Sequence, residues 1–308
     1  MVSNITAVVV TRNRSKLLSN CLSSLKRQTL KPKTTIIIDN ASTDGTHLYL
    51  KKEGFLNSKN IVYRYLKKNT GGAGGFSHGL RLAISKGADW VWMMDDDALP
   101  HDNALNELMK VTDNPYNVYG STPVAGSRLS WGVMAISSDG SKAYIEDVCD
   151  MPNVTEVVFL PFLGILIHRN MVEKIGTPDS GFFIAADDVE YTVRAKKIGA
   201  KLIQVGRSRI DHPPASMYRI NILGRTIFCL KLPPWKRYYD TRNRLLIAKK
   251  HYGNRLYSET IPGVLVRFLA ALVFEPQKGS QMWAFFTGFI DGLLGLKGMR
   301  HSIWGIQF

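Results

Sequence analysis

The sequence predicts an α/β fold, in which helices cover both faces of a mainly parallel sheet and a helical region follows. Apolar runs rich in β-branched residues alternate with helical patterns through the first half of the chain, which is typical of such sheets. A polar cluster follows each apolar run. Because the carboxyl ends of parallel strands lie at one edge of a sheet, we expect these clusters to meet and form a binding site there.

The first half contains four strand patterns and three helical patterns. The strands are continuous apolar runs, which indicates burial on both faces of the sheet. In the first helical pattern, Leu18, Leu22 and Leu25 fall on one face. The expected strands cover residues 5–11, 34–39, 61–66 and 90–94, and the second and third helices cover about 43–53 and 76–86.

The second half is less regular, because Gly and Pro interrupt its short strand patterns. A loop ends in Asp187 and Asp188, and Gly199 closes the helix that follows. A basic, aromatic helix and two apolar segments complete the chain. The expected strands cover residues 133–137, 154–159, 164–168 and 201–205, and the helical or apolar segments cover 189–198, 235–252, 261–274 and 282–296.

Composition limits the classes of partner. A chain of 308 residues with 45% hydrophobic residues can bury a large core, and its net charge of +15 favours an anionic partner. Nucleic acid is disfavoured, because no binding signature occurs and the basic residues are spread along the chain. Three scattered cysteines indicate neither a disulfide framework nor a zinc site, and the N-terminus reads as a strand rather than a signal peptide. We therefore expect a cytoplasmic protein.

Three aspartates, Asp95, Asp96 and Asp97, directly follow the fourth expected strand. Mg²⁺ or Mn²⁺ on a diphosphate needs one or two carboxylates and open positions for phosphate oxygens. In an extended chain Asp95 and Asp97 point the same way, so we expect them to face one metal ion while Asp96 points elsewhere. No neighbouring base neutralises these charges along the sequence, which disfavours a solvated acidic loop.

The run GGAGG, residues 71–75, precedes the third helical pattern. Glycines let a bulky ligand approach the backbone, and a following helix presents free N–H groups. The spacing is neither a Walker motif nor a dinucleotide fingerprint, so a flexible turn is the alternative. Helix capping is likewise an alternative for Asp187 and Asp188, and His212, just before two prolines, reads by itself as a loop residue.

Four segments, in this order and spacing, resemble the nucleotide-sugar-binding half of inverting family-2 glycosyltransferases with the GT-A fold. The segments are VVVTRNR, IIIDNASTDGT, NTGGAGGF and WMMDDDALP, and the resemblance is strongest to the bacterial galactofuranosyltransferases. It covers roughly residues 4–250. It implies a catalytic domain over 1–230, with a nucleotide-sugar half at about 1–125 and an acceptor half at about 126–230. Residues 231–308 then form a helical region that contacts the acceptor or a membrane surface.

The resemblance also implies roles for individual residues. Asp95, Asp97 and His212 would hold Mn²⁺ or Mg²⁺ on the diphosphate of a UDP-sugar, and Asp188, with Asp187 beside it, would supply the catalytic base. The segment YYDTRN is similar to one in related transferases, which implies acceptor contacts from Tyr238, Tyr239, Arg242 and Asn243. The implied donor contacts are Thr11, Arg12, Asn13, Asp39, Asn40, Asn69, Gly71, Gly72, Gly75 and Asp96.

The activity implied is inverting transfer of galactofuranose from UDP-galactofuranose to a polyprenyl-diphosphate-linked glycan, in the synthesis of a bacterial cell-surface polysaccharide. The Q-x-x-R-W motif of processive synthases is absent, which favours one or a few additions. A rhamnosyltransferase that uses dTDP-rhamnose is one alternative. A metal-dependent nucleotidyl- or phosphotransferase is another, although it leaves His212, Asp187 and Asp188 without roles.

The two apolar segments near the C-terminus predict attachment to a membrane surface. The segment 261–274 is short for a span and carries Arg267, and the segment 282–296 is interrupted by Asp291 and glycines. With the aromatic and basic residues around them, they fit helices that lie on anionic lipid at the inner face of the cell membrane. Core helices of a bundle, or the interface of a homo-oligomer, are the alternative.

Overall fold

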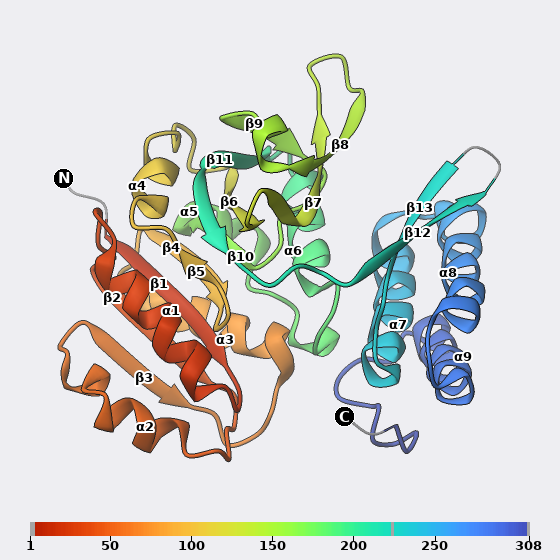
Figure 1. Ribbon diagram of the computed structural model, residues 1–308, viewed down its shortest axis with the longest axis horizontal. Helices are drawn as coiled ribbons and strands as arrows, with labels where there is room; N and C mark the ends of the chain where they lie inside the picture. Colours follow the sequence, from red (N-terminus) through yellow and green to blue (C-terminus); the bar gives the residue numbers. More distant parts are fainter. Residues whose placement is uncertain (1–3, 223–224, 307–308) are drawn as a thin grey trace.

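A computed structural model describes residues 4–222 and 225–306, and it consists of a mixed sheet flanked by helices and a C-terminal helical region (Figure 1). The sheet has the order β3-β2-β1-β4-β10-β6-β11-β9-β7-β8, and the short strand β5 pairs with β11. Its strands are β1 (Ile5–Thr11), β2 (Thr34–Asp39), β3 (Ile61–Tyr65), β4 (Trp90–Asp95), β5 (Leu99–Pro100), β6 (Val118–Ala125), β7 (Arg128–Ile136), β8 (Lys142–Asp147), β9 (Val154–Val157), β10 (Leu163–His168) and β11 (Leu202–Asp211).

The first four strands are parallel, as the sequence predicts. β1 lies between β2 and β4, and the register pairs Thr11 with Asp39 and Val10 with Asp95. This register brings the polar ends of three strands to one edge of the sheet. Beyond β4 the sheet becomes mixed, because β10 is antiparallel to both β4 and β6, while β11 is parallel to β6.

Helices cover both faces of the sheet, which confirms the predicted layers. Alternate residues of β1 point to opposite faces, so Val8 and Val10 enter one core while Ala7 and Val9 enter the other. Helices α3, α5 and α6 pack into the first core, and α1, α2 and α4 pack into the second. Their bounds are α1 (Ser15–Arg27), α2 (Thr46–Lys52), α3 (Gly71–Ser85), α4 (Ala104–Met109), α5 (Arg169–Ile175) and α6 (Asp187–Lys197).

Several elements differ from their predicted bounds. Helix α3 begins at Gly71, so the glycine run forms its first turns rather than a preceding loop, and α6 begins at Asp187. Strand β11 continues to Asp211, close to His212. The sequence patterns did not predict β6, β8, α4 and α5, which are short or, in β6, contain Gly and Pro.

The C-terminal region contains a hairpin and three helices that pack together (Figure 1). Helix α7 lies along α9, and the buried Asp291 of α9 accepts hydrogen bonds from Tyr238 of α7 and from Arg300 and Trp304 of the tail. The tail is therefore folded back onto α7. The elements are β12 (Met217–Ile222), β13 (Arg225–Leu230), α7 (Pro234–His251), a π-helical turn (Leu256–Thr260), α8 (Ile261–Phe274) and α9 (Lys278–Leu294).

The first apolar segment forms a longer helix than predicted. The π-helical turn runs directly into α8, giving a 19-residue helix, Leu256–Phe274, that by length and composition alone could cross a membrane. The expectation that this segment is too short is therefore wrong. Only 28% of the apolar window of this helix is buried, which disfavours a core helix of a bundle.

Candidate active site

The site begins where β1 and β4 end side by side. The hydroxyl of Thr11 donates a hydrogen bond of 2.7 Å to Asp96, and both side chains are buried. Strand β4 stops at Asp95, so Asp96 and Asp97 lie in a turn rather than in an extended strand. The extended chain on which we based the shared direction of Asp95 and Asp97 is therefore absent beyond Asp95.

Arg14 neutralises two of the three aspartates. One guanidinium nitrogen lies 3.2 Å from Asp96 and 2.8 Å from Asp97. The expectation that no basic residue neutralises these aspartates is therefore wrong. Arg14 is that residue, and it follows the neighbouring strand β1 rather than lying next to the aspartates in the sequence. Parallel pairing of β1 with β4 was the signal that could have found Arg14, since it places TRNR beside DDD.

Asp97 and His212 form the centre of the candidate metal site. Nε2 of His212 lies 3.5 Å from Oδ1 of Asp97, which brings together the turn after β4 and the residue that follows β11. Asp97 Oδ1 and His212 Nδ1 are both buried without a hydrogen-bond partner. Although burial acts in the opposite direction, His212 and Arg14 hold the pKa of Asp97 below its usual value.

These side chains fit a divalent cation. A buried carboxylate oxygen without a partner is costly, and a cation would satisfy it. Burial, together with the charges of Asp97 and Asp96, raises the pKa of Asp95 well above its usual value, and a cation would also relieve this repulsion. In the part of the chain that the structure describes, however, no three His, Cys, Asp or Glu side chains are grouped to bind a metal ion. Asp95 thus does not complete a site with Asp97 and His212.

The other predicted donor residues divide into exposed and internal groups. Arg12 and Asn13 are exposed after β1. Asp39 and Asn40 are buried and bond within the protein: Asp39 accepts from Ser42 at 2.8 Å, and Asn40 donates to the carbonyl of Gly71 at 2.8 Å. Asp39 and Asn40 therefore shape the edge of the sheet from within.

The glycine run serves close packing. The backbone N–H of Ala73 donates to the carbonyl of Phe183 at 3.1 Å, and that of Gly71 donates to Asn69 at 3.0 Å, so these two helix N–H groups are not free for a ligand. A Cβ atom on Gly71 would overlap the carbonyl of Phe183, and one on Gly75 would press on Val10. Only glycine allows α3 to approach both β1 and the chain around Phe183 this closely.

We expect Gly71→Ala to destabilise the protein more than the matched variant Gly126→Ala. Both glycines have positive φ, +70° and +65°, but no atom lies within 4 Å of a Cβ on Gly126. The backbone conformation alone costs about 1–2 kcal/mol in each variant. Overlap with the Phe183 carbonyl adds roughly 1–3 kcal/mol in Gly71→Ala only. Urea unfolding measures both, and equal losses would contradict the packing role.

Asp187 and Asp188 open α6 beside the first turn of α3. Oδ2 of Asp187 lies 3.8 Å from the position that a Cβ of Gly72 would take, and Asp188 accepts the N–H of Val189 at 2.7 Å. Ala186 occupies the N-cap position and no side chain caps the helix there, while both aspartates lie in the first turn, where their charges also suit the helix dipole. Burial raises the pKa of Asp188 to about 6. Burial and the charge of Asp188 raise the pKa of Asp187 to about 8.

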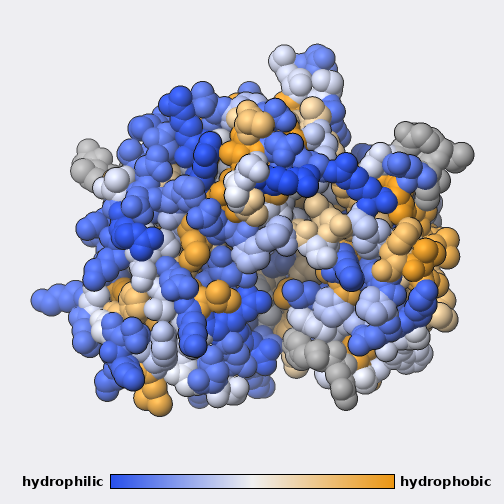
Figure 2. All heavy atoms as spheres, in the orientation of Figure 1, coloured by the Kyte–Doolittle hydropathy of each residue, from blue (hydrophilic) through white to orange (hydrophobic). Residues whose placement is uncertain are grey.

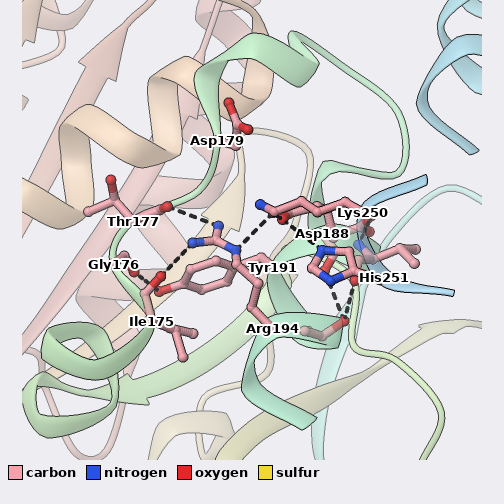
Figure 3. A network of polar contacts seen from close by, with 12 residues as sticks. Ile175, Gly176, Thr177, Asp179, Asp188, Tyr191, Arg194, Lys250 and His251 are labelled. Carbon is pink, nitrogen blue, oxygen red and sulfur yellow. Dashed lines mark hydrogen bonds and ion pairs between the residues drawn. The ribbon is translucent and has the colours of Figure 1, made fainter. Parts of the chain in front are cut away.

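A buried ionic network supports α6 one turn further on (Figure 3). The fully buried carboxylate of Glu190 accepts from Arg194 at 3.0 Å and from Lys250 at 2.9 Å, and Nε2 of His251 lies 3.2 Å away. Arg194 also donates to the carbonyl of Thr177 at 2.9 Å. The network ties α6 to the end of α7 and to the chain after α5, which fixes the direction in which α6 begins.

The segment YYDTRN is internal, which corrects the expectation of acceptor contacts. Tyr238, Tyr239, Arg242 and Asn243 all have 0% of their surface exposed, so they offer no face to an acceptor. Their partners lie within the protein: Tyr239 bonds to His301, and Arg242 and Asn243 donate to backbone carbonyls before Asp187. The sequence could not separate these roles, because tyrosine, arginine and asparagine serve equally at a binding surface.

The chain is similar in sequence to known glycosyltransferases. Residues 6–135 match the model of the family described as Glycosyl transferase family 2. The chain is 28% identical to galactofuranosyltransferase GlfT1 of Mycobacterium tuberculosis (strain ATCC 25618 / H37Rv) over 79% of this chain and 82% of that protein. It is 23% identical to dTDP-rhamnosyl transferase RfbF of Shigella flexneri over 97% of this chain and 98% of that protein.

Solved structures share the fold at low identity. GalNAc-T7 with UDP, GalNAc and Mn²⁺ superposes with a TM-score of 0.64 at 13% identity, over 98% of this chain. The chain spans only 57% of the GalNAc-T7 chain. Mannosyltransferase PcManGT from Pyrobaculum calidifontis, in complex with GDP-Man and Mn²⁺, has a TM-score of 0.57 at 15% identity and is matched over 94% of this chain and 87% of its own.

Proposed function

The chain is a family-2 glycosyltransferase with the GT-A fold, and on this premise we propose that it transfers galactofuranose from UDP-galactofuranose to a lipid-linked glycan, with inversion. One observation carries the proposal. The Asp97–His212 pair, which joins the two halves of the chain, and the acid pair Asp187–Asp188 lie at the same edge of the sheet, where the charge of Asp187 acts on Asp95. Such an arrangement suits a diphosphate leaving group on one side and an attacking hydroxyl on the other.

Asp188 is the proposed base. Burial, and for Asp187 the charge of Asp188, raise the pKa of the two neighbouring carboxyls, so the pair holds one proton more readily than two separate carboxyls and one carboxylate stays available as a base. Asp188 accepts the proton of the acceptor hydroxyl as that oxygen attacks the anomeric carbon. A single displacement of this kind inverts the configuration.

Asp97 and His212 are the proposed metal-binding residues. A divalent cation would neutralise the charge that develops on the departing UDP. The imidazole favours Mn²⁺ over Mg²⁺, which prefers oxygen ligands. Mn²⁺ in the solved structures of GalNAc-T7 and PcManGT supports the same choice. Arg12 and Asn13, which are exposed between Thr11 and the Arg14 that contacts Asp97, are the proposed contacts for the nucleotide.

A panel of donors tests the proposed function. Purified protein is incubated with UDP-galactofuranose, dTDP-rhamnose or UDP-glucose and a polyprenyl-diphosphate-linked glycan, and the products are identified by mass spectrometry. We expect one or a few galactofuranose additions. Transfer of rhamnose alone would favour the second candidate, dTDP-rhamnosyl transfer, which the match to RfbF over 97% of the chain supports. Release of nucleotide without an acceptor would contradict both.

We propose that residues 1–230 form the catalytic domain and that residues 231–308 attach it to the inner face of the membrane. Large apolar side chains are exposed on α8 and α9, and Figure 2 shows hydrophobic residues gathered at the edge of the molecule formed by this region. On α8 they follow a four-residue spacing, so they share one face. They are Leu265, Leu269 and Val273 on α8, and Trp283, Phe286, Ile290 and Leu294 on α9.

We expect the double variant Leu269→Glu/Val273→Glu to bind anionic liposomes about tenfold or more weakly, because it places two charges on the apolar face. Leu48→Glu is the control, since Leu48 is also an exposed leucine, 71% exposed against 59% for Leu269, and lies on α2 outside this region. Co-sedimentation measures binding, and UDP affinity should not change in either variant. Unchanged liposome binding with loss of a dimer in sedimentation would identify the face as a subunit interface.

A further inference from the structure

The loop of residues 181–186, which leads into the acid pair, has an unusual backbone. Phe183, Ala185 and Ala186 have φ of 65°, 66° and 57°. None of the three is glycine, so a positive φ at each costs on the order of 1–3 kcal/mol, and Phe183, with ψ of −66°, forms a strained γ-turn. A loop of this kind persists only where surrounding contacts hold it.

Asn243 holds this loop from α7. Its side-chain amide nitrogen donates to three backbone carbonyls, those of Phe182 at 3.0 Å, Ile184 at 2.8 Å and Ala185 at 2.7 Å. The amide oxygen accepts from Nε of Arg242 at 2.9 Å. Because a guanidinium can only donate, this bond fixes the amide with its nitrogen toward the loop.

Arg242 completes the support. It donates to the carbonyls of Phe182 at 2.8 Å and Gly181 at 3.2 Å, and also to that of Gly298 at 2.7 Å. The N–H of Gly298 in turn donates to Gly181 at 2.6 Å, so the C-terminal segment contributes. On the opposite side, the carbonyl of Phe183 accepts the N–H of Ala73 at the start of α3.

We propose that Arg242 and Asn243 are positioning residues, which hold the 181–186 loop in its strained conformation and thereby set where Asp187 and Asp188 stand relative to α3. The inference rests on the proposed function for the role of Asp188. Two fully buried side chains donate five hydrogen bonds to four consecutive or near-consecutive carbonyls of this loop, those of Gly181, Phe182, Ile184 and Ala185. An error of about 1 Å in the place of a base can cost 10²-fold in rate.

The test compares Asn243→Ala with Gln281→Ala. Gln281 is a matched control, because it is a buried amide, 2% exposed, whose nitrogen donates to the backbone carbonyl of Leu232 at 2.7 Å, outside the loop. For Asn243→Ala we expect turnover at saturating donor to fall about 10²-fold, with UDP affinity within about twofold and an unchanged binding stoichiometry. Hydrogen exchange should quicken at the amides of 181–186. Gln281→Ala should change neither turnover per folded molecule nor exchange in the loop.

Two results would overturn the inference. One is equal turnover in Asn243→Ala and Gln281→Ala, and the other is a fall in UDP stoichiometry that matches the fall in turnover, which would indicate a merely structural role. Should Asn243→Ala fail to fold, Arg242→Lys tests the same support, because it keeps the charge but loses the fork of donors. Failure of the proposed function would give a different result from failure of this inference. Wild-type protein would then transfer no sugar, but hydrogen exchange in the 181–186 loop would still be faster in Asn243→Ala than in Gln281→Ala.

Discussion

Asp188→Asn is expected to lower turnover by roughly 10²–10⁴-fold while UDP-sugar affinity stays unchanged. An amide keeps the oxygen that accepts the N–H of Val189, so the local backbone contact survives. It cannot accept a proton from the acceptor hydroxyl. Calorimetry measures binding, and UDP release with the same acceptor measures turnover. Asp139→Asn is the control, because Asp139 accepts the N–H of Ser141 in an exposed turn.

The pH dependence gives an independent check on Asp188. With a pKa of about 6, Asp188 becomes protonated as the pH falls through 6, so wild-type turnover should decline there. Near-normal turnover in Asp188→Asn would remove the base assignment. Loss of donor binding together with turnover would instead indicate a structural or metal-site role.

The free energy of unfolding should change with pH in the opposite direction to turnover. The folded pKa of Asp188 is raised, so folding favours the protonated form, and wild-type protein loses stability as the pH rises from about 4 through 6. Asn has no charge to bury. Asp188→Asn should therefore be more stable than wild type at pH 8, by on the order of 2 kcal/mol, and the difference should shrink near pH 4. Melting temperatures across this range measure the effect.

The parallel strands could be predicted because their burial is simple. β1 and β2 are enclosed on both faces, so their sequences are continuous apolar runs with clear ends, and the structure gives them the predicted bounds. The same register brings Thr11, Asp39 and Asp95 to one edge, which made the location of the site predictable.

The remaining details depend on contacts between distant parts of the chain. Gly71 is required by Phe183, more than a hundred residues away, and no local pattern connects them. Asn243 was predicted to contact the acceptor because its true partners are equally distant in the sequence. They are the carbonyls of residues about 60 positions earlier. Composition identifies polar residues near a site, but only the fold separates those that face a ligand from those that hold the loop behind it.

Asp97→Ala is expected to abolish the effect of Mn²⁺ on UDP binding. In wild type, Oδ1 of Asp97 is buried without a hydrogen-bond partner and lies 3.5 Å from Nε2 of His212, so a cation shared with the diphosphate would gain two protein ligands there. We expect Mn²⁺ to tighten UDP binding at least 10–100-fold in wild type. Loss of a residue that only supports a metal ligand already lowers metal affinity or activity by this factor. His212→Ala should weaken the response in the same direction.

The control for Asp97→Ala is Asp102→Ala. Asp97 also pairs with Arg14, so its removal breaks an arginine–aspartate ion pair as well as the proposed metal site. Asp102 pairs with Arg27 at 3.3 Å, and its loss breaks an arginine–aspartate pair, a more exposed one, without touching His212. Calorimetric titration of UDP with and without Mn²⁺ should show the metal response intact in Asp102→Ala and absent in Asp97→Ala. If wild-type UDP affinity is the same with and without Mn²⁺, Asp97 and His212 are not metal-binding residues, and their pairing is structural.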